Sequence, residues 1–475
     1  MKTSHNQSNF RWISAGVSFA RTLAMAVSLM LALGQAARAA DGSWNVTGSG
    51  NWADAFNWTP GIPGVGNGTT NPDIATFGLP LAAASTVTVD ANRNIGGITF
   101  SNNSTFGYTL SGGSLRLSNG GLIQSLAAGG AHSEIIVSAI TIQGNGVNPS
   151  SLTVTSNSAS ASNRIQLNGG VAGAASVATT LTLNGSNINS NSTGTISNGG
   201  SGGTLAIIKD GTGEWNIASN NSFSGGVTLQ QGTLGFAQAA GSFGTGTLTI
   251  NRGTLQSRNV TAAAAFTNAI VVGGDFSVKD ASSNSYSTTF SGTMDLGGAT
   301  RTITANQVGS PSAFIFSGVI SNGGLTKAGT DTLTLSGANT YTGDTTVSTG
   351  TLLLAGTSQT SFAIGANGTN NQILGGGTLT LDGSFSFDLT SAGTTLGNSW
   401  DIVHVATLTE TFGGTFNVLG FTNIGGNLWE KVNGGTTYQF SQATGLLSVV
   451  PEPSTWALLA FSLTTIVFLR RRRMA

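Results

Sequence analysis

Three pairs of acidic residues are close enough in the sequence to suggest the chemistry of a polysaccharide-cleaving site. The pairs are Asp210 with Glu214, Asp275 with Asp280, and Asp382 with Asp388. Enzymes that cleave glycosidic bonds use two carboxyl groups, one protonated and one ionised. Carboxylates can equally hold a metal ion. None of these pairs lies in a recognisable motif, and Asp382 is followed by glycine, as in a turn. We therefore expect neither a catalytic site nor a metal site.

Other groups that could act as nucleophiles or metal ligands are rare. The chain has no cysteine, and between residues 40 and 450 its histidines are His132 and His404. Neither an H-E-x-x-H helix nor a G-x-S-x-G elbow that joins a strand to a helix is indicated. His404 lies in the alternating stretch SWDIVHVATL, which favours an ordinary strand residue over a catalyst. The sequence predicts a protein that is not an enzyme and that needs no cofactor.

The segments that carry these residues are patterned as β-strands. Short alternations of apolar and polar residues, such as STVTVDAN and SLTVTSN, each stop at asparagine, aspartate or glycine. Glycine accounts for 70 of the 475 residues, whereas lysine, glutamate and arginine, which favour helices, are scarce. An alternating strand has one apolar face that must be buried. The pattern predicts an all-β fold.

One unit of strands and turns occurs twice. The segment from Lys209 to Ala237 aligns without a gap to the segment from Lys327 to Ala355, with ten identical residues out of 29. Repeated strands and turns are typical of a solenoid, in which each coil stacks on the next. The second copy, KAGTDTLTLSGANTYTGDTTVSTGTLLLA, resembles the passenger-associated, or autotransporter-associated, β-strand repeat. This resemblance implies a right-handed parallel β-helix.

Aromatic residues are concentrated at both ends of the repetitive region. Near the start lie Trp44, Trp52 and Trp58. A solenoid needs atypical end units to close its core, so both aromatic regions are expected to act as caps. The three tryptophans could alternatively stack on sugar rings. The predicted parts are a cap over residues 40–80, a β-helix over residues 81–390 and a C-terminal β region over residues 391–448.

The N-terminal segment, residues 1–39, has the layout of a secretory signal peptide. Basic residues precede the apolar run Leu23 to Leu33, and the small residues Ala37 and Ala39 predict cleavage by signal peptidase. Ten basic and 17 acidic residues lie between Ala40 and Val450, which gives this body a net charge of −7. Nucleic acid and anionic lipid would need a basic surface. We expect an exported protein that binds no nucleic acid.

The C-terminal segment, residues 449–475, carries a second set of targeting features. Its distinctive positions are Pro451, Glu452 and Pro453 at the start and Arg470, Arg471, Arg472 and Arg473 near the end. The 14 residues from Trp456 to Leu469 are uncharged. As a helix they would span about 21 Å, which is short for a hydrocarbon core of about 30 Å. The positive-inside tendency places the arginines in the cytoplasm. We expect a short transmembrane helix that anchors the chain in the inner membrane transiently.

This order of features resembles the PEP-CTERM sorting signal. The resemblance implies an exosortase-type protease as a partner, which cuts near Pro451 and releases the body to the cell surface. Proline cannot continue a helix, so the site should stay extended and accessible. We expect a structural or adhesive protein of the cell surface or of an exopolysaccharide or biofilm matrix. The alternatives are a polysaccharide-binding module that uses the tryptophans and, third, a β-helical polysaccharide-degrading enzyme.

Overall fold

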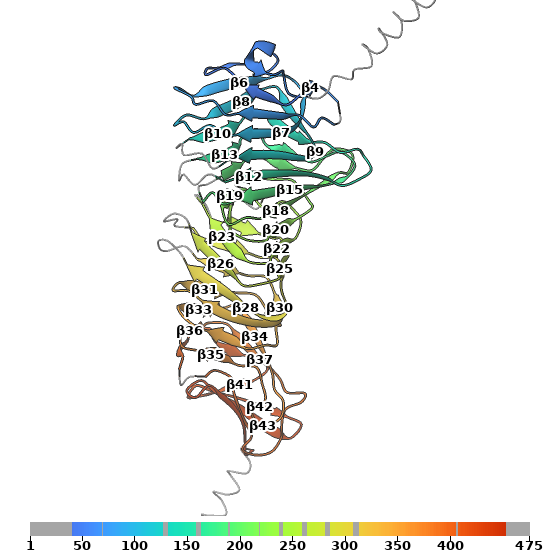
Figure 1. Cartoon of the computed structure of the whole chain (residues 1–475). Coiled ribbons are helices and arrows are strands. Elements are labelled where there is room, and N and C mark those ends of the chain that lie inside the picture. Colours follow the sequence, from blue (N-terminus) through green and yellow to red (C-terminus); the bar gives the residue numbers. More distant parts are fainter. Residues whose placement is uncertain are drawn as a thin grey trace, which may run out of the picture.

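The computed structural model describes residues 40–68, 70–126, 132–157, 163–188, 191–217, 219–236, 241–258, 264–280, 286–306, 313–404 and 407–452. These residues form a parallel β-solenoid of about 11 turns, stacked into a rod with the N-terminal coils at the top of the view (Figure 1). Helical structure in the described residues is limited to the 3-10 turn η1 (Ala55–Asn57). The all-β prediction is confirmed.

The two targeting segments predicted from the sequence lie outside the described residues, apart from Pro451 and Glu452. These segments are the signal peptide with Ala37 and Ala39, and the tail from Pro453 through Arg470, Arg471, Arg472 and Arg473. Within the part of the chain that is described, no helix has the length and apolar composition needed to cross a membrane.

Parallel strands stack in three columns along the rod. The first column contains β1 (Gly42–Trp44), β5 (Ile74–Phe77), β7 (Arg93–Phe100), β9 (Ser114–Ser125), β12 (Ser150–Ser156), β15 (Ala178–Gly185), β18 (Thr204–Lys209), β20 (Val227–Leu229), β22 (Leu248–Ile250), β25 (Ile270–Val272) and the first residues of β28 (Met294–Asn306) and β30 (Ile320–Ala328). The second contains β2 (Gly50–Asn51), β6 (Ser85–Val89), β8 (Tyr108–Gly112), β10 (Ser133–Ile136), β13 (Arg164–Leu167), β16 (Asn191–Thr193), β19 (Glu214–Asn216), β21 (Thr233–Phe236), β23 (Gly253–Ser257), β26 (Phe276–Asp280), the last residues of β28 and β30, β32 (Thr345–Val347) and β35 (Ile373–Gly375).

The third column changes composition along the rod. Its upper part contains β11 (Ala139–Ile142), β14 (Val171–Ala172) and β17 (Ile196–Ser197). Lower down lie β24 (Ala264–Phe266), β27 (Thr288–Phe290), β29 (Phe314–Phe316), β31 (Thr332–Leu335), β33 (Thr351–Leu354), β36 (Thr378–Leu381) and β39 (Thr409–Phe412), beside a short sheet of β34 (Gln359–Ala363), β37 (Ser384–Asp388) and β40 (Asn417–Val418). Antiparallel additions at the N-terminal end are β3 (Trp58–Thr59) and β4 (Val65–Gly66).

Successive strands pair in register, so apolar residues of neighbouring coils form continuous columns in the core. Leu152 of β12 is level with Leu181 of β15, and Leu181 is level with Ile207 of β18. All three side chains are buried. Burying one such side chain contributes about 1.5 to 3 kcal/mol, and alternation repeats that contribution in every coil. The next residues along the three strands, Thr153, Thr182 and Ile208, face outward, as the period of two requires.

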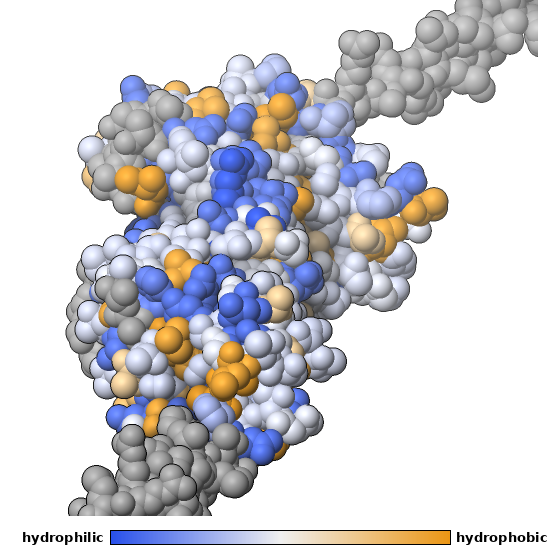
Figure 2. Space-filling model, turned by 90° about the horizontal axis from the view of Figure 1, so that it is seen from below, coloured by the Kyte–Doolittle hydropathy of each residue, from blue (hydrophilic) through white to orange (hydrophobic). Residues whose placement is uncertain are grey.

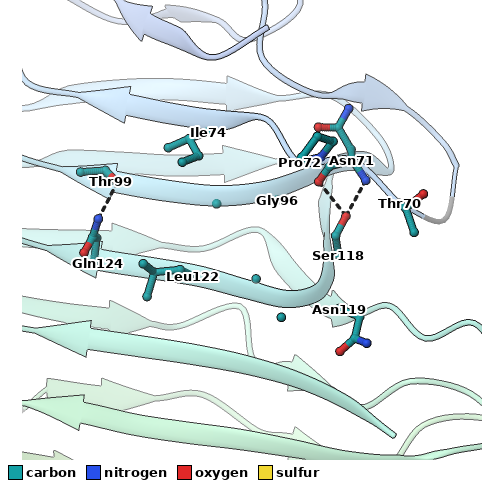
Figure 3. A pocket seen from close by; sticks show the side chains of 13 residues that line it. Thr70, Asn71, Pro72, Ile74, Gly96, Thr99, Ser118, Asn119, Leu122 and Gln124 are labelled. Atoms are coloured by element: carbon teal, nitrogen blue, oxygen red, sulfur yellow. Dashed lines mark hydrogen bonds between the residues drawn. The ribbon is translucent and has the colours of Figure 1, made fainter. Parts of the chain in front are cut away.

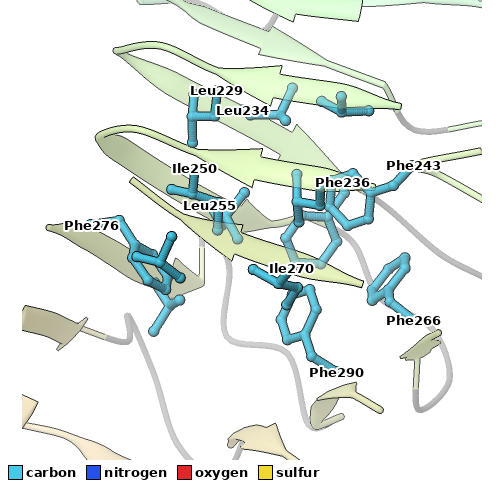
Figure 4. Close-up of a cluster of buried hydrophobic side chains, with 14 of the residues drawn as sticks. Leu229, Leu234, Phe236, Phe243, Ile250, Leu255, Phe266, Ile270, Phe276 and Phe290 are labelled. Carbon is cyan, nitrogen blue, oxygen red and sulfur yellow. The ribbon is translucent and has the colours of Figure 1, made fainter. Parts of the chain in front are cut away.

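A ladder of phenylalanines fills the core in the middle of the rod (Figure 4). Phe266, Phe290 and Phe316 are level with one another in β24, β27 and β29. Their ring centroids are 5.4 and 5.3 Å apart, with interplanar angles of 28° and 20°. Phe236 and Phe243 pack on the top of this ladder. Each stacked pair adds about 0.5 to 1.5 kcal/mol beyond its buried area.

An antiparallel sheet closes the C-terminal end of the rod. Its strands, in spatial order, are β38 (Ser399–Asp401), β44 (Leu446–Val450), β43 (Thr436–Ser441), β42 (Leu428–Asn433) and β41 (Thr422–Gly425). The sheet buries Trp400, Tyr438 and Phe440. It covers apolar surface that a further coil would otherwise have covered, which is the role of an end unit in a solenoid.

Parallel pairing extends past both ends of the range 81–390 that we predicted for the β-helix. β1 and β5 already pair in parallel inside the expected N-terminal cap. At the other end β36 pairs in parallel with β39, beyond residue 390. The predicted boundaries followed aromatic content, whereas the limits of the ladder are decided by backbone hydrogen bonding between coils. Aromatic content and ladder limits therefore do not coincide.

Candidate functional site

The three N-terminal tryptophans belong to the core of the first coils. The exposed fractions of Trp44, Trp52 and Trp58 are 1%, 0% and 3%. Trp58 lies 5.1 Å from Trp44 and 5.0 Å from Trp52, measured between ring centroids. The Trp52 indole N–H donates to the carbonyl oxygen of Pro63 (3.0 Å), and that of Trp58 donates to the carbonyl oxygen of Trp52 (2.7 Å). Sugar stacking by these rings, one of our two interpretations, is wrong for this structure, because packing covers their faces.

The acidic pairs are dispersed into local contacts. Asp275 is exposed while Asp280 is buried, so these two carboxylates do not share a face. Glu214 forms an ion pair with Arg258. The backbone N–H of Gly211 and the side-chain amide of Gln231 hold the pKa of Asp210 below its usual value.

Asp382 and Asp388 also have separate hydrogen-bond partners. The Asp382 carbonyl accepts from the Thr415 hydroxyl (2.7 Å), and Asp388 accepts from the hydroxyl and backbone N–H of Thr390. These bonds, the one from the hydroxyl first, lower the pKa of Asp388. A glycosidase acid needs a raised pKa, so the shifts at Asp210 and Asp388 have the wrong direction for that role. Among the described residues, no three histidine, aspartate or glutamate side chains gather closely enough to hold a metal ion.

We had predicted that His404 is an ordinary strand residue. In the structure it lies just beyond the end of β38, outside any strand. Its Nδ1 atom is 2.6 Å from Oδ2 of Asp401, and both side chains are more than one third exposed. The strand ends early because Ile402 and Val403 turn to hydrogen-bond with the carbonyl oxygen of Gly445. An exposed pair of this kind contributes little to stability.

A buried charged cluster lies between the coils that contain β8 and β10. Glu134 faces the core from β10, with an exposed fraction of 1%. Its Oε1 accepts from Nε2 of His132 (2.8 Å) and from Nδ2 of Asn102 (2.7 Å), and its Oε2 accepts from the backbone N–H of Tyr108 (2.8 Å). The other ring nitrogen of His132 is 2.7 Å from the carbonyl oxygen of Ser104. Both partners of the ring are oxygen acceptors, a carboxylate and a backbone carbonyl, so the two contacts favour the imidazole that carries a proton on each nitrogen.

The His132–Glu134 pair makes stability depend on pH. Burial lowers the pKa of His132, but the hydrogen bond and negative charge of Glu134 and the Ser104 carbonyl outweigh burial and raise the pKa above 6.5. The folded chain therefore holds this proton more tightly than the unfolded chain. The contribution is fully present below about pH 6.5 and is lost as the pH rises through the folded value.

We expect the free energy of unfolding of the wild type to fall, relative to that of His132→Gln, as the pH rises from 6 through 8. The comparison is made by urea unfolding at each pH, with both proteins in the same buffer. The Glu134 carboxylate is the charged group that faces the ring, and it stays in place in the variant. Parallel curves for the two proteins would show that the ring is not charged in the folded state.

A lysine is buried in the core at the start of the first sequence repeat. Lys209 ends β18, where it is level with Leu183 above and Leu229 below. Its exposed fraction is 0%. Its aliphatic stem fills a position in an apolar column, while the ammonium reaches the adjacent turn. The ammonium donates to the carbonyl oxygens of Asp210 (2.7 Å), Gly211 (2.8 Å) and Gln231 (3.1 Å).

The second repeat reproduces this site. Lys327 of β30 is level with Ile303 and Val347 and is also buried. Its ammonium donates to the carbonyl oxygens of Ala328 (2.8 Å), Gly329 (2.8 Å) and Thr349 (3.0 Å). Three donors meet three acceptors at both sites, so each lysine joins the turn of its own coil to the turn of the next. Burial lowers the pKa of Lys209 and of Lys327 to about 8, although nearby carboxylates act in the opposite direction.

The turn that receives each ammonium requires glycine. Gly350 has φ of +66°, and a Cβ atom there would lie 2.4 Å from the carbonyl oxygen of Gly329. Gly232, at the same position of the first repeat, has φ of +75° and the same conflict with Gly211. Any side chain would force the two coils apart, so the K-x-G…G-T-L spacing is a packing requirement.

Both lysine sites fall within a known repeat. The passenger-associated-transport-repeat matches residues 207–235 and 325–354. Comparison with curated proteins and with solved structures gives no match. The resemblance predicted from Lys327 to Ala355 is thus confirmed for the passenger-associated repeat. The repeat and the β-solenoid fit an exported, passenger-like protein without a catalytic role.

Two features of the interior were missed by sequence reasoning. The sequence alignment shows lysine at the same position of both passenger-associated repeats, Lys209 and Lys327, but it predicted no role for these two residues. The signal was a lysine at the last apolar position of a strand alternation. Glu134 gave a comparable signal, because in SEIIVSAITI it has the same parity as the buried Ile136. A charge on an apolar face predicts a buried partner, although it does not name that partner.

Proposed function

We propose that this chain is an exported structural protein, a right-handed β-helical rod that is displayed at the cell surface or within an exopolysaccharide or biofilm matrix. The observation that carries this proposal is the pair of passenger-associated repeats, which stack with the same lysine contacts five coils apart. Such a core can be extended coil by coil without disulfides, because each coil bonds only to its neighbours.

The outward-facing side chains of the first column support a display role. Thr153, Thr182, Thr228 and Thr249 are half-buried at equivalent positions of their coils, with Ile208 between Thr182 and Thr228. The surface seen from the C-terminal end of the rod is mostly near neutral in hydropathy, with small apolar and hydrophilic areas interspersed (Figure 2). A surface of this kind remains soluble without presenting one large apolar patch.

The C-terminal sorting signal is the second part of the proposal. β44 is paired with β43 up to Val450, which is level with Thr437. Pro451 follows directly outside the sheet, and Glu452 is exposed. Cleavage by an exosortase-type protease beyond Pro451 would leave every strand of the terminal sheet in place. The body would therefore be released folded after its transient anchoring in the inner membrane.

Mass spectrometry of the protein from the cell surface tests this route. We expect a mature N-terminus near Ala40 and a C-terminus near Pro451, with the residues from Trp456 to Ala475 removed. A matched variant in which Pro451 and Pro453 are both replaced by alanine should remain associated with the inner membrane. An intact Ala475 on surface-located wild type would contradict processing and would leave the tail as a permanent anchor.

The alternatives to a structural role are weaker. A polysaccharide-binding role through Trp44, Trp52 and Trp58 loses its basis, since these rings are buried. A polysaccharide-degrading role lacks a pair of carboxylates with opposed pKa shifts on one described face, because Asp210 and Asp388 are both shifted downward. Assay of the purified chain on neutral and acidic polysaccharides, with release of reducing ends as the readout, would detect such an activity.

A further inference from the structure

A hollow lies on the outer face of the first column, near the N-terminal end of the rod (Figure 3). Here Ile74 of β5, Gly97 of β7 and Leu122 of β9 are level with one another and face outward. Gly97 has no side chain, so Ile74 and Leu122 form two walls with an open floor between them. The hollow, which we call the Gly97 trough, has a volume of about 430 Å³. Sites for small ligands have volumes of about 300 to 1,000 Å³.

The fold does not require glycine at position 97, on the floor of the trough. The neighbouring Gly96 is required, because a Cβ atom there would lie 2.7 Å from the carbonyl oxygen of Asn71. Gly97 has no left-handed φ, and its Cβ atom would approach one backbone atom, the carbonyl oxygen of Leu122, at 3.0 Å. A shift of a few tenths of an ångström would accommodate it. Glycine inside a strand weakens the strand, and it often marks a place where a ligand approaches the backbone.

The lining of the Gly97 trough is uncharged and has polar groups at both ends. At one end Gln124 donates to the hydroxyl of Thr99 (3.1 Å). At the other end the Ser118 hydroxyl bonds to the backbone of Asn71 (2.7 and 2.9 Å). No ionisable side chain is among the residues that line the trough. A charged ligand would lose its hydration without gaining a partner, so a neutral ligand is favoured.

The middle of the trough is apolar and open to solvent. Ile74 and Leu122 are 39% and 36% exposed, although both are aliphatic residues on a sheet surface. A ligand that combines C–H faces with hydroxyl groups along its edges would cover the walls and reach the polar ends. A peptide could not bind here by strand addition, because β7 is already paired with β5 and β9 on both sides.

We infer that the Gly97 trough binds a short stretch of neutral polysaccharide, two to three sugar residues long. The aliphatic walls pack against the C–H faces of the rings. The amide of Gln124 and the hydroxyl of Thr99 exchange their mutual hydrogen bond for bonds to sugar hydroxyls. This site is distinct from the buried tryptophans, and it does not depend on how the tail is processed.

Titration of the purified full-length chain with neutral trisaccharides tests the site. The probes are maltotriose, cellotriose and mannotriose, with trigalacturonic acid as the charged comparison, and the detergent must have no sugar headgroup. We expect at least one neutral trisaccharide to bind with a Kd of about 1 mM or lower, and the acidic one to bind at least about tenfold more weakly. Absence of binding by all three neutral probes at 10-fold higher concentration overturns the inference, as does equal binding of the acidic probe.

Two variants locate the binding in the trough. Gly97→Leu fills the floor and should weaken binding at least about tenfold, while Gln124→Ala should weaken it several-fold without adding any group to the strand. The matched control is Thr182→Leu, which places the same side chain on the same outer column three coils away from Gly97. Thermal unfolding curves check that each variant is folded. Unchanged affinity in Gln124→Ala and in folded Gly97→Leu would place the sugar elsewhere and overturn the inference.

Discussion

Replacing both Lys209 and Lys327 by methionine is expected to lower the free energy of unfolding by about 5 kcal/mol at pH 7. Each ammonium donates to three backbone carbonyls, and a hydrogen bond to a charged group contributes about 1.5 to 3 kcal/mol. Methionine also removes the cost of burying a charge, which offsets part of the loss of these hydrogen bonds. The net loss is then about 2 to 3 kcal/mol per site. The sites are five coils, or about 24 Å, apart, so their effects should add.

Urea unfolding followed by circular dichroism measures this loss. The matched control is Lys279→Met, because Lys279 lies half-buried on the outer face of β26 and not in the core. The control should change the free energy of unfolding by less than about 0.5 kcal/mol. If Lys327→Met were as stable as Lys279→Met, the three carbonyl contacts would have no net effect on stability.

The same variants carry a pH dependence with a defined sign. The pKa of each buried lysine is about 8, against 10.5 in the unfolded chain. Between these values the unfolded chain binds protons that the folded chain has released, so the stability of the wild type rises with pH relative to the double methionine variant. A difference that stays constant from pH 7 to 10.5 would contradict the lowered pKa values.

Replacing Glu134 by leucine is expected to lower the free energy of unfolding by about 3 to 5 kcal/mol, the range typical for breaking a buried ion pair. The change removes the acceptor of three donors, from His132, Asn102 and the backbone of Tyr108. His132 would then be a buried charge without its counter-ion. Urea unfolding at pH 6, where the pair contributes most, gives the clearest comparison.

A double replacement separates the ion pair from simple loss of packing. When both His132 and Glu134 are leucine, no uncompensated charge remains in the core, so part of the lost stability should return. The matched control for the single change is Glu430→Leu, because Glu430 lies half-buried on β42 and its carboxylate accepts a weak bond from Gln439 (3.4 Å). A double variant less stable than Glu134→Leu alone would show that the histidine is not charged when folded.

Much of the architecture could be predicted because it depends on local alternation. A strand such as Thr180 to Leu183 shows one apolar face in the sequence, and any solution that buries this face coil after coil has the same parallel arrangement. The gapless match between Lys209 to Ala237 and Lys327 to Ala355 added the repeat itself. The passenger-associated repeat then accounted for its turns.

The candidate sites could not be predicted with the same success. Trp52 and Trp58 have the composition of a sugar platform, yet whether an indole is buried depends on residues more than ten positions away, such as Pro63 for Trp52. The Gly97 trough was equally invisible, since its walls come from three coils. Gly97 is one glycine among 70 until Ile74 and Leu122 are brought level with it.

The sequence by itself determined that this chain forms short strands with one buried face, that glycine turns separate them, and that two units repeat. These properties follow from side-chain period and backbone freedom within a few residues. Only the tertiary structure decided that Lys209 and Lys327 each join two turns, that Glu134 meets His132, and that an outer hollow opens at Gly97. The register between coils controls these contacts. Backbone hydrogen bonds between segments about 20 to 30 residues apart fix that register, so it cannot be read from any single segment.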